Sequence, residues 1–163
     1  MAANMLAAYY DVVEDTSELF DNLLIQNFPS YQEHKNKYDV IKINMQEFLS
    51  VTHDVDEMLA ILQKRLIKEL KLKYPDYVDS EYLIFVMQDI FMYTNHPFVI
   101  LIDEWDCLFR EYKQNKEAQK KYLDFLRAWL KDKDYVALAY MTGILPIKKY
   151  GSHSALNMFT EYS

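Results

Sequence analysis

Only two of the 163 residues are glycine, Gly143 and Gly151, and this scarcity restricts the possible folds more than any other feature of the sequence. Average usage of about 7% would give a chain of this length roughly eleven glycines. Tight turns, β-rich sandwiches and phosphate-binding loops all need residues that tolerate a left-handed backbone, and glycine fills that role. We therefore predict a helix-rich chain with few tight turns and without a complete glycine-rich phosphate loop.

The overall composition is that of a globular protein, and it excludes several functions. Hydrophobic residues make up 51% of the chain and charged residues 26%. The net charge of −7 argues against a nucleic-acid partner, since phosphate backbones are bound by clustered cations. A single cysteine, Cys107, rules out an internal disulfide and is typical of a reducing compartment. No stretch approaches the ~20 apolar residues that span a bilayer, and the first residues lack a basic signal-peptide region. We expect a soluble cytoplasmic protein with no membrane partner.

Three segments have the apolar patterns of β-strands. Val40–Met45 alternates apolar and polar side chains, which predicts a strand at the edge of a sheet. Phe98–Ile102 and Val136–Met141 are continuously apolar, which predicts strands covered on both faces. The segments between them have helical periodicity, so the crossovers predict an α/β fold with parallel strands. We expect the spatial order Val136–Met141, Phe98–Ile102, Val40–Met45, with helices on both faces.

Helix-start signals precede the apolar stripes between these strands. Asp54 and Glu57 have the spacing of a capping box, which predicts a helix that begins at this point. Ser80 is a candidate N-cap for the next helix, and a charged helix is expected over Glu117–Lys131.

Polar residues follow two of the predicted strands and form the candidate site. Asp103 and Glu104 come directly after the strand at Phe98–Ile102, and Thr142 ends the strand at Val136–Met141. Ligands of open α/β sheets bind beyond the carboxyl ends of the strands, so these side chains would share one edge of the sheet. In phosphoryl-transfer enzymes an aspartate at this place holds Mg²⁺, and a neighbouring acid polarises the attacking water. The competing interpretation is that Asp103 and Glu104 cap a helix and Thr142 belongs to a turn.

Other candidate constellations fail on their spacing. Gly143 and Lys148 do not form a phosphate loop, because that motif needs a second glycine directly before the lysine. His153 stands where a nucleophile elbow would have its serine. The four histidines have no metal-ligand spacing to one another or to Cys107.

Several blocks of the sequence resemble the bacterial AAA-ATPase-like family. The blocks extend in order over nearly the whole chain, and the long third one is the most specific. They are Asn4–Asp11, Leu101–Asp106, Tyr140–Gly151, Ser154–Asn157 and Glu161–Ser163. Members of the family are P-loop NTPases, commonly with a restriction-endonuclease-like domain later in the chain. The resemblance implies a P-loop NTPase-type three-layer αβα sandwich, of which about three parallel strands are present here.

The resemblance also implies a role for each candidate site residue. Asp103 would be the Walker B residue that binds magnesium, Glu104 the catalytic glutamate and Thr142 the sensor residue on the next strand. The cofactors of a complete protein would be ATP and Mg²⁺.

This sequence departs from the family pattern in one respect, because it contains no Walker A loop with Gly-Lys-Thr. We expect residues 1–163 to be a truncated domain, with the first strand and that loop missing upstream of Met1 and later strands missing downstream. The isolated chain would then be catalytically inactive with no bound nucleotide, and the edge of Val136–Met141 would be open to self-association. The alternative from another functional class is a non-enzymatic α/β module for protein interaction.

Overall fold

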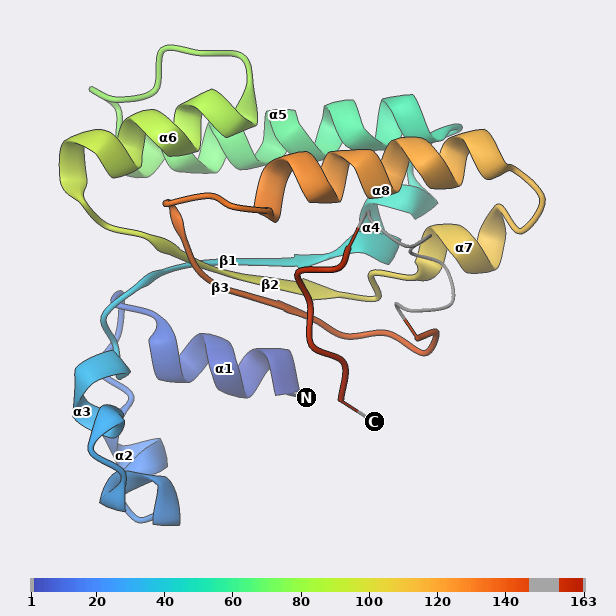
Figure 1. Ribbon diagram of the computed structural model, residues 1–163. Helices are drawn as coiled ribbons and strands as arrows, with labels where there is room; N and C mark the ends of the chain where they lie inside the picture. Colours follow the sequence, from blue (N-terminus) through green and yellow to red (C-terminus); the bar gives the residue numbers. More distant parts are fainter. Residues whose placement is uncertain (1, 147–155, 163) are drawn as a thin grey trace.

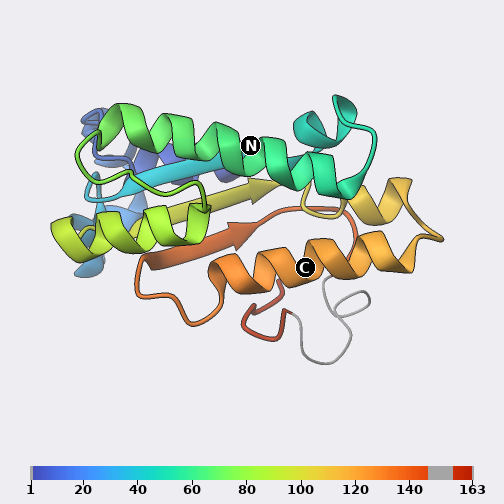
Figure 2. The same cartoon turned by 90° about the horizontal axis from the view of Figure 1, so that it is seen from above.

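Helices pack on both faces of a parallel three-stranded sheet in the computed structural model, which describes residues 2–146 and 156–162 (Figures 1 and 2). The elements follow one another as α1 (Ala2–Tyr10), α2 (Ser17–Phe20), the 3₁₀ turn η1 (Leu24–Asn27), α3 (Ser30–His34), β1 (Asp39–Asn44), α4 (Met45–Ser50), α5 (Val55–Lys73), α6 (Leu83–Thr94), β2 (Phe98–Asp103), α7 (Cys107–Glu111), α8 (Lys116–Leu130) and β3 (Val136–Met141). The fold is thus α/β, in agreement with a partial P-loop-type αβα sandwich.

The strand order is β1-β2-β3, with both neighbouring pairs parallel, as the strand patterns predict. In this register Asn44 lies opposite Asp103, and Ile102 lies opposite Met141. The carboxyl ends of all three strands therefore lie together, along the side of the sheet that is perpendicular to the strands.

Strand β2 is buried on both faces, which confirms the interpretation of its continuous apolar run. Phe98, Ile100 and Ile102 belong to the main hydrophobic cluster beneath α5, α6 and α8. Val99 and Leu101 point to the opposite face, where α1 contacts β1 and β2, and both are buried.

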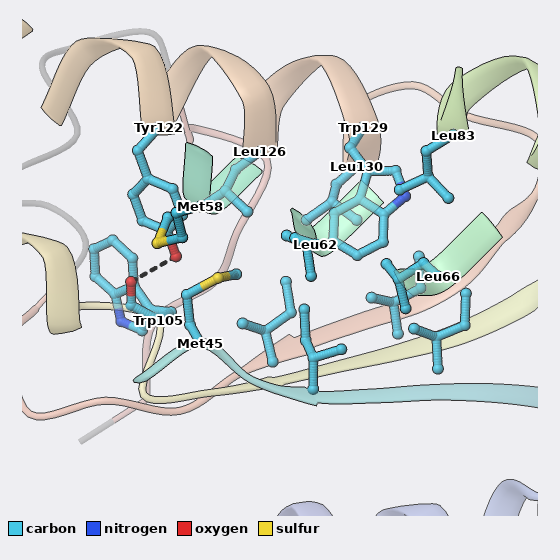
Figure 3. Close-up of a cluster of buried hydrophobic side chains, with 14 of the residues drawn as sticks. Met45, Met58, Leu62, Leu66, Leu83, Trp105, Tyr122, Leu126, Trp129 and Leu130 are labelled. Atoms are coloured by element: carbon cyan, nitrogen blue, oxygen red, sulfur yellow. Dashed lines mark hydrogen bonds between the residues drawn. The ribbon is translucent and has the colours of Figure 1, made fainter. Parts of the chain in front are cut away.

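The main core lies between the sheet and the layer of α5, α6 and α8 (Figure 3). Its largest members are fully enclosed aromatic and aliphatic side chains, and the buried polar atoms among them are hydrogen-bonded. Tyr135 donates its hydroxyl hydrogen to the carbonyl of Trp129, whose indole N–H lies 3.1 Å from the sulfur of Met87. The side chains labelled in Figure 3 are Met45, Met58, Leu62, Leu66, Leu83, Trp105, Tyr122, Leu126, Trp129 and Leu130.

The helix start predicted at Asp54 is present, with a variant of the capping box in which Glu57 binds the amide one residue before the N-cap. The Asp54 carboxylate accepts from the Glu57 amide at 2.8 Å, and the Glu57 carboxylate accepts from the His53 amide at 2.8 Å. The longest helix, α5, begins at this box. Within the ranges that the structure describes, no helix combines the length and the apolar character needed to cross a bilayer.

Two predicted boundaries are wrong. Ser80 is not an N-cap, because α6 begins only at Leu83 and the Ser80 hydroxyl instead accepts from the Tyr82 amide. Met45 does not extend β1, because the Asn44 side chain accepts from the Gln46 amide and starts α4 there.

Strand β3 lies at an edge of the sheet, as the predicted strand order requires, but the prediction that its apolar run is covered on both faces is wrong. None of its six residues is buried, whereas five of the six in β2 are. Its free side borders a groove of about 740 Å³, which the C-terminal segment 158–162 and residues 143–146 also line. The groove exists because nothing in the described residues pairs with this edge of the sheet.

Candidate functional site

The predicted site residues meet at the carboxyl ends of β2 and β3. The Thr142 amide donates to the carbonyl of Ile102 at 2.9 Å, which continues the parallel ladder by one residue. This pairing brings the Thr142 hydroxyl to Asp103, where it donates to Oδ1. The same Oδ1 accepts from the Glu104 amide at 3.0 Å. The sheet therefore places Asp103 and Thr142 in direct contact, although 39 positions separate them in the sequence.

Glu104 has a backbone conformation that is uncommon for its residue type. Its φ is 54°, in the left-handed region, which costs a residue with a Cβ on the order of 1 kcal/mol. The conformation is fixed on both sides, because the Glu104 carbonyl accepts from the Cys107 amide at 3.1 Å while its own amide binds Asp103. The turn ends the strand sharply and leaves the Glu104 side chain about one-third exposed at the edge of the sheet.

The Glu104 carboxylate makes an ion pair with Arg110. One terminal nitrogen of the guanidinium donates to Glu104 Oε2, and the Arg110 side chain is 31% exposed. The interpretation of Asp103 and Glu104 as helix caps is wrong, because α7 begins at Cys107 and its N-cap residue is Asp106, without a side-chain capping bond.

Asp106 is a further polar residue of the site that the sequence analysis missed. Its side chain is fully buried, and its Oδ2 accepts from the amides of Ile144 and Leu145 at 3.1 and 2.9 Å. The carboxylate thus ties the segment after Thr142 to the turn after β2. A signal was present, since Asp106 follows Glu104 by two residues, but only the folded chain shows which backbone amides it meets.

Gly143 lies against this buried carboxylate. A Cβ at this position would lie 2.6 Å from Asp106 Oδ1 and 2.7 Å from the nearest ring carbon of Trp105. Glycine is therefore needed here for close approach of the backbone, and not for a phosphate loop.

The two titratable side chains beneath the site are buried and have raised pKa values. Burial raises the pKa of the Cys107 thiol to about 12. Burial also raises the pKa of Tyr122 well above its usual value, and the Tyr122 hydroxyl donates to the carbonyl of Trp105 at 2.7 Å. Figure 3 shows this bond as a dashed line between Tyr122 and Trp105. Both groups remain protonated at neutral pH and serve as packing.

The oxygen ligands at the site are of the type that suits Mg²⁺. Magnesium binds through one or two carboxylates, with water and substrate phosphates in its other positions, so Asp103 beside the Thr142 hydroxyl fits such an ion. No cluster of three or more histidine, cysteine, aspartate or glutamate side chains that would hold a metal alone is found in residues 2–146 and 156–162.

The sequence lacks the loop that holds nucleotide phosphates in P-loop proteins. The sequence contains two glycines and no Gly-Lys-Thr, so the amides and the lysine that hold phosphates in P-loop proteins are not present in it. Lys148 and His153, which the sequence analysis considered and set aside, lie outside the described residues.

Comparison with known proteins identifies a family for the chain. A family model described as predicted AAA-ATPase matches residues 1–152, which include the strand ends, Asp103, Glu104 and Thr142. No curated protein and no solved structure matches the chain.

Proposed function

Because the chain belongs to the predicted AAA-ATPase family, we propose that it carries the magnesium-binding and water-activating part of an ATP-hydrolysis site. The observation that supports this proposal most strongly is the contact between Thr142 and Asp103, with Glu104 next in sequence, at the ends of adjacent parallel strands. Ligands of open α/β sheets bind at this position.

Each of the three side chains has a distinct role in this proposal. Asp103 holds Mg²⁺, which when bound neutralises charge on the phosphate oxygens. Glu104 accepts a proton from a water molecule, whose oxygen then bonds to the terminal phosphorus as the bond to the bridging oxygen breaks. Thr142 fixes Asp103 through its hydroxyl and stays at the edge of the sheet, where it can contact the same phosphate.

We propose further that this chain works with a phosphate-binding strand and loop that its own sequence lacks. Two observations support this idea. One is the scarcity of glycine, and the other is the edge of β3, which is unpaired among the described residues and belongs to an apolar strand with no buried residue. The 163-residue chain by itself is then expected to release no phosphate from ATP above background.

A non-enzymatic interaction module remains the second candidate, and one surface favours it. The segment of α2 and η1 projects away from the sheet and carries large apolar side chains that are between 41% and 84% exposed (Figure 1). They are Leu19, Leu23, Leu24, Ile25 and Phe28. Exposed apolar patches of this kind mark interaction surfaces.

Steady-state phosphate release distinguishes the two candidates. The protein to test is the chain with the strand and Gly-Lys-Thr loop of its family joined before Met1, called the extended chain below. We expect it to bind and hydrolyse MgATP. Glu104→Gln should slow hydrolysis by about 10²–10⁴-fold and leave nucleotide affinity intact, since the amide keeps the shape but accepts no proton. Asp103→Asn should weaken the dependence on magnesium.

Glu111→Gln is the matched control, because it removes an exposed glutamate from α7, close to the site in sequence. It should leave hydrolysis unchanged. An extended chain that hydrolyses ATP at the same rate with Glu104→Gln would contradict the assignment of Glu104. An extended chain that binds no nucleotide would favour the interaction module.

A further inference from the structure

Helix α6 carries large apolar side chains on two opposite sides, but only one of these sides is buried. The buried side packs on the main core through Leu83, Val86, Met87 and Ile90. The other side, together with the residue before the helix, carries large side chains that are between 55% and 68% exposed, namely Tyr82, Phe85, Met92 and Tyr93. A surface helix normally turns a polar side to water, so the exposed side of α6 has the character of a surface that another molecule covers.

Aromatic rings on the exposed side of α6 are already packed against one another. Tyr77, from the loop before the helix, stacks on Tyr93 with the ring centroids 5.1 Å apart and an angle of 16° between the ring planes. Tyr82 meets Phe85 edge to face, with the centroids 5.9 Å apart. These four rings and the side chain of Met92 are called the α6 face below. Because rings held by their neighbours lose little conformational freedom on binding, the α6 face is suited to a partner.

The charges that accompany the α6 face in the sequence are all negative. Residues 74–94, which form the loop and α6, contain no lysine or arginine but have four acidic residues. The four are Asp76, Asp79, Glu81 and Asp89. Asp89 lies on the same side of the helix as the rings, one turn from Phe85 and from Tyr93. Within the described part of the chain, none of the four side chains makes an ion pair or a hydrogen bond, so their charges are free to attract a cation.

We propose that the α6 face binds a lysine- or arginine-rich segment of a partner protein. The flat side of an aromatic ring attracts a cation, and the free carboxylates add a Coulomb attraction that steers the same segment. A second copy of the chain is disfavoured, because a symmetric dimer through this face would place the four carboxylates opposite those of the other copy. Anionic lipids and nucleic acids are disfavoured by the same negative charges.

The α6 face is separate from the candidate ATP site and from the exposed surface of α2 and η1. Helix α6 leads into the amino end of β2, whereas Asp103 and Thr142 lie at the carboxyl ends of the strands. Figure 1 shows α6 on the side of the sheet opposite to α2, and at the other end of the molecule from α7. The inference therefore goes beyond the proposed function and can be tested without nucleotide.

A titration followed by fluorescence anisotropy tests the proposal on the 163-residue chain. The probe is a labelled helical peptide of leucine and lysine, with the leucines on one side of the helix. We expect saturable binding that weakens as the salt concentration rises, because salt screens exposed charges. The same peptide with glutamate in place of lysine should not bind. Equal binding of both peptides, or binding of neither, would overturn the proposal.

Substitutions on the α6 face locate the binding. The double variant Phe85→Ser, Tyr93→Ser should weaken binding of the lysine peptide by about ten-fold or more, since aromatic anchors dominate interfaces. Glu81→Gln should weaken it by about 2–5-fold at low salt. Two matched controls should leave the affinity unchanged, namely Phe28→Ser, which removes a 63% exposed ring from the surface of α2 and η1, and Glu111→Gln. If Phe28→Ser weakens binding and the α6 variants do not, the proposal is wrong.

The methionine methyl signals in an NMR spectrum give a measurement that needs no substitution in the α6 face. The lysine peptide should shift the Met92 signal and leave that of Met5, which is 55% exposed on α1, unchanged. An unchanged Met92 signal would place the peptide elsewhere. A Met92 signal that moves with the concentration of the chain alone would show that a second copy covers the face. Either result would overturn the proposal and leave the ATPase function untouched.

Discussion

Replacing Tyr122 with phenylalanine tests how the core supports the turn that carries the site. Tyr122 is fully buried on α8, and its hydroxyl donates to the carbonyl of Trp105 at 2.7 Å. The amide of the same Trp105 donates to the Thr142 carbonyl at 3.1 Å. The Tyr122 hydroxyl thus fixes the carbonyl of Trp105, while the amide of the same residue is bonded to Thr142, directly after β3.

The expected magnitude follows from what the substitution leaves behind. Tyr122→Phe creates no cavity larger than an oxygen atom, but it leaves the buried Trp105 carbonyl without the hydrogen bond that satisfies it. An unsatisfied buried acceptor costs about 1–3 kcal/mol of unfolding free energy. A chain of this size loses about 2–4 °C of thermal midpoint per kcal/mol, so we expect a fall of several degrees.

Tyr112→Phe is the matched control. Its hydroxyl also donates to a backbone carbonyl, that of His53 at 3.1 Å, but this bond is exposed to water. Water replaces the lost donor there, so the change should stay within about 0.5 kcal/mol. Urea and thermal unfolding followed by circular dichroism measure both variants. Equal losses in the two variants would refute the argument that burial sets the cost.

Alkaline titration gives an independent check on Tyr122. The pKa of the folded group lies above that of an unfolded tyrosine, so its contribution to stability is complete below about pH 10 and declines as the pH rises beyond that value. The decline reflects ionisation of the unfolded state first. Tyr122→Phe should therefore lose stability less steeply than the parent above pH 10, and an unchanged slope would contradict this.

Two further predictions concern Cys107 and the edge of β3. Cys107 is buried and the pKa of its thiol is raised to about 12, so a thiol reagent at pH 8 should label the native chain negligibly. The urea-unfolded chain should take up one equivalent of the reagent. Rapid labelling of the native chain would contradict the prediction and show that the site opens. The edge of Val136–Met141 is unpaired among the described residues, so the 163-residue chain should self-associate. Sedimentation velocity should then show a concentration-dependent oligomer. Ala137 is exposed, and Ala137→Lys should weaken the oligomer because lysines on an edge strand oppose strand pairing. If the parent chain is a monomer at all concentrations, the prediction of self-association is wrong.

The strands could be predicted from the sequence because their patterns report local burial. The continuous run at Phe98–Ile102 has both faces covered, and the alternation at Val40–Met45 matches a strand with Ile41 and Ile43 buried and Lys42 exposed. The run at Val136–Met141 has the same character as the central strand but lies at the edge. An apolar sequence indicates that both faces of a strand can be buried. How much of the strand is buried depends on the helices and strands that pack against it.

The candidate site could be predicted only in part, for a related reason. Parallel strands end at one edge of the sheet, so the proximity of Asp103 and Thr142 follows from topology alone. The positions of Arg110 and Asp106 depend on the left-handed turn at Glu104 and on how closely Gly143 approaches it. No residue pattern predicts a positive φ at a glutamate, so the ion pair between Glu104 and Arg110 could not be predicted from the sequence.

The single pairing of β3 links the assembly of the site to the local stability of one strand. Strand β2 is hydrogen-bonded to neighbours on both sides, but in the described part of the chain β3 is bonded to β2 alone. Opening of β3 requires no disruption of the β1–β2 ladder, so it belongs to the low-energy openings that amide hydrogen exchange detects. Each such opening separates Thr142 from Asp103. A second chain that pairs with the free edge of β3 therefore also favours the state in which Thr142 contacts Asp103. By thermodynamic linkage, a ligand that binds only this state strengthens the pairing at the edge of β3.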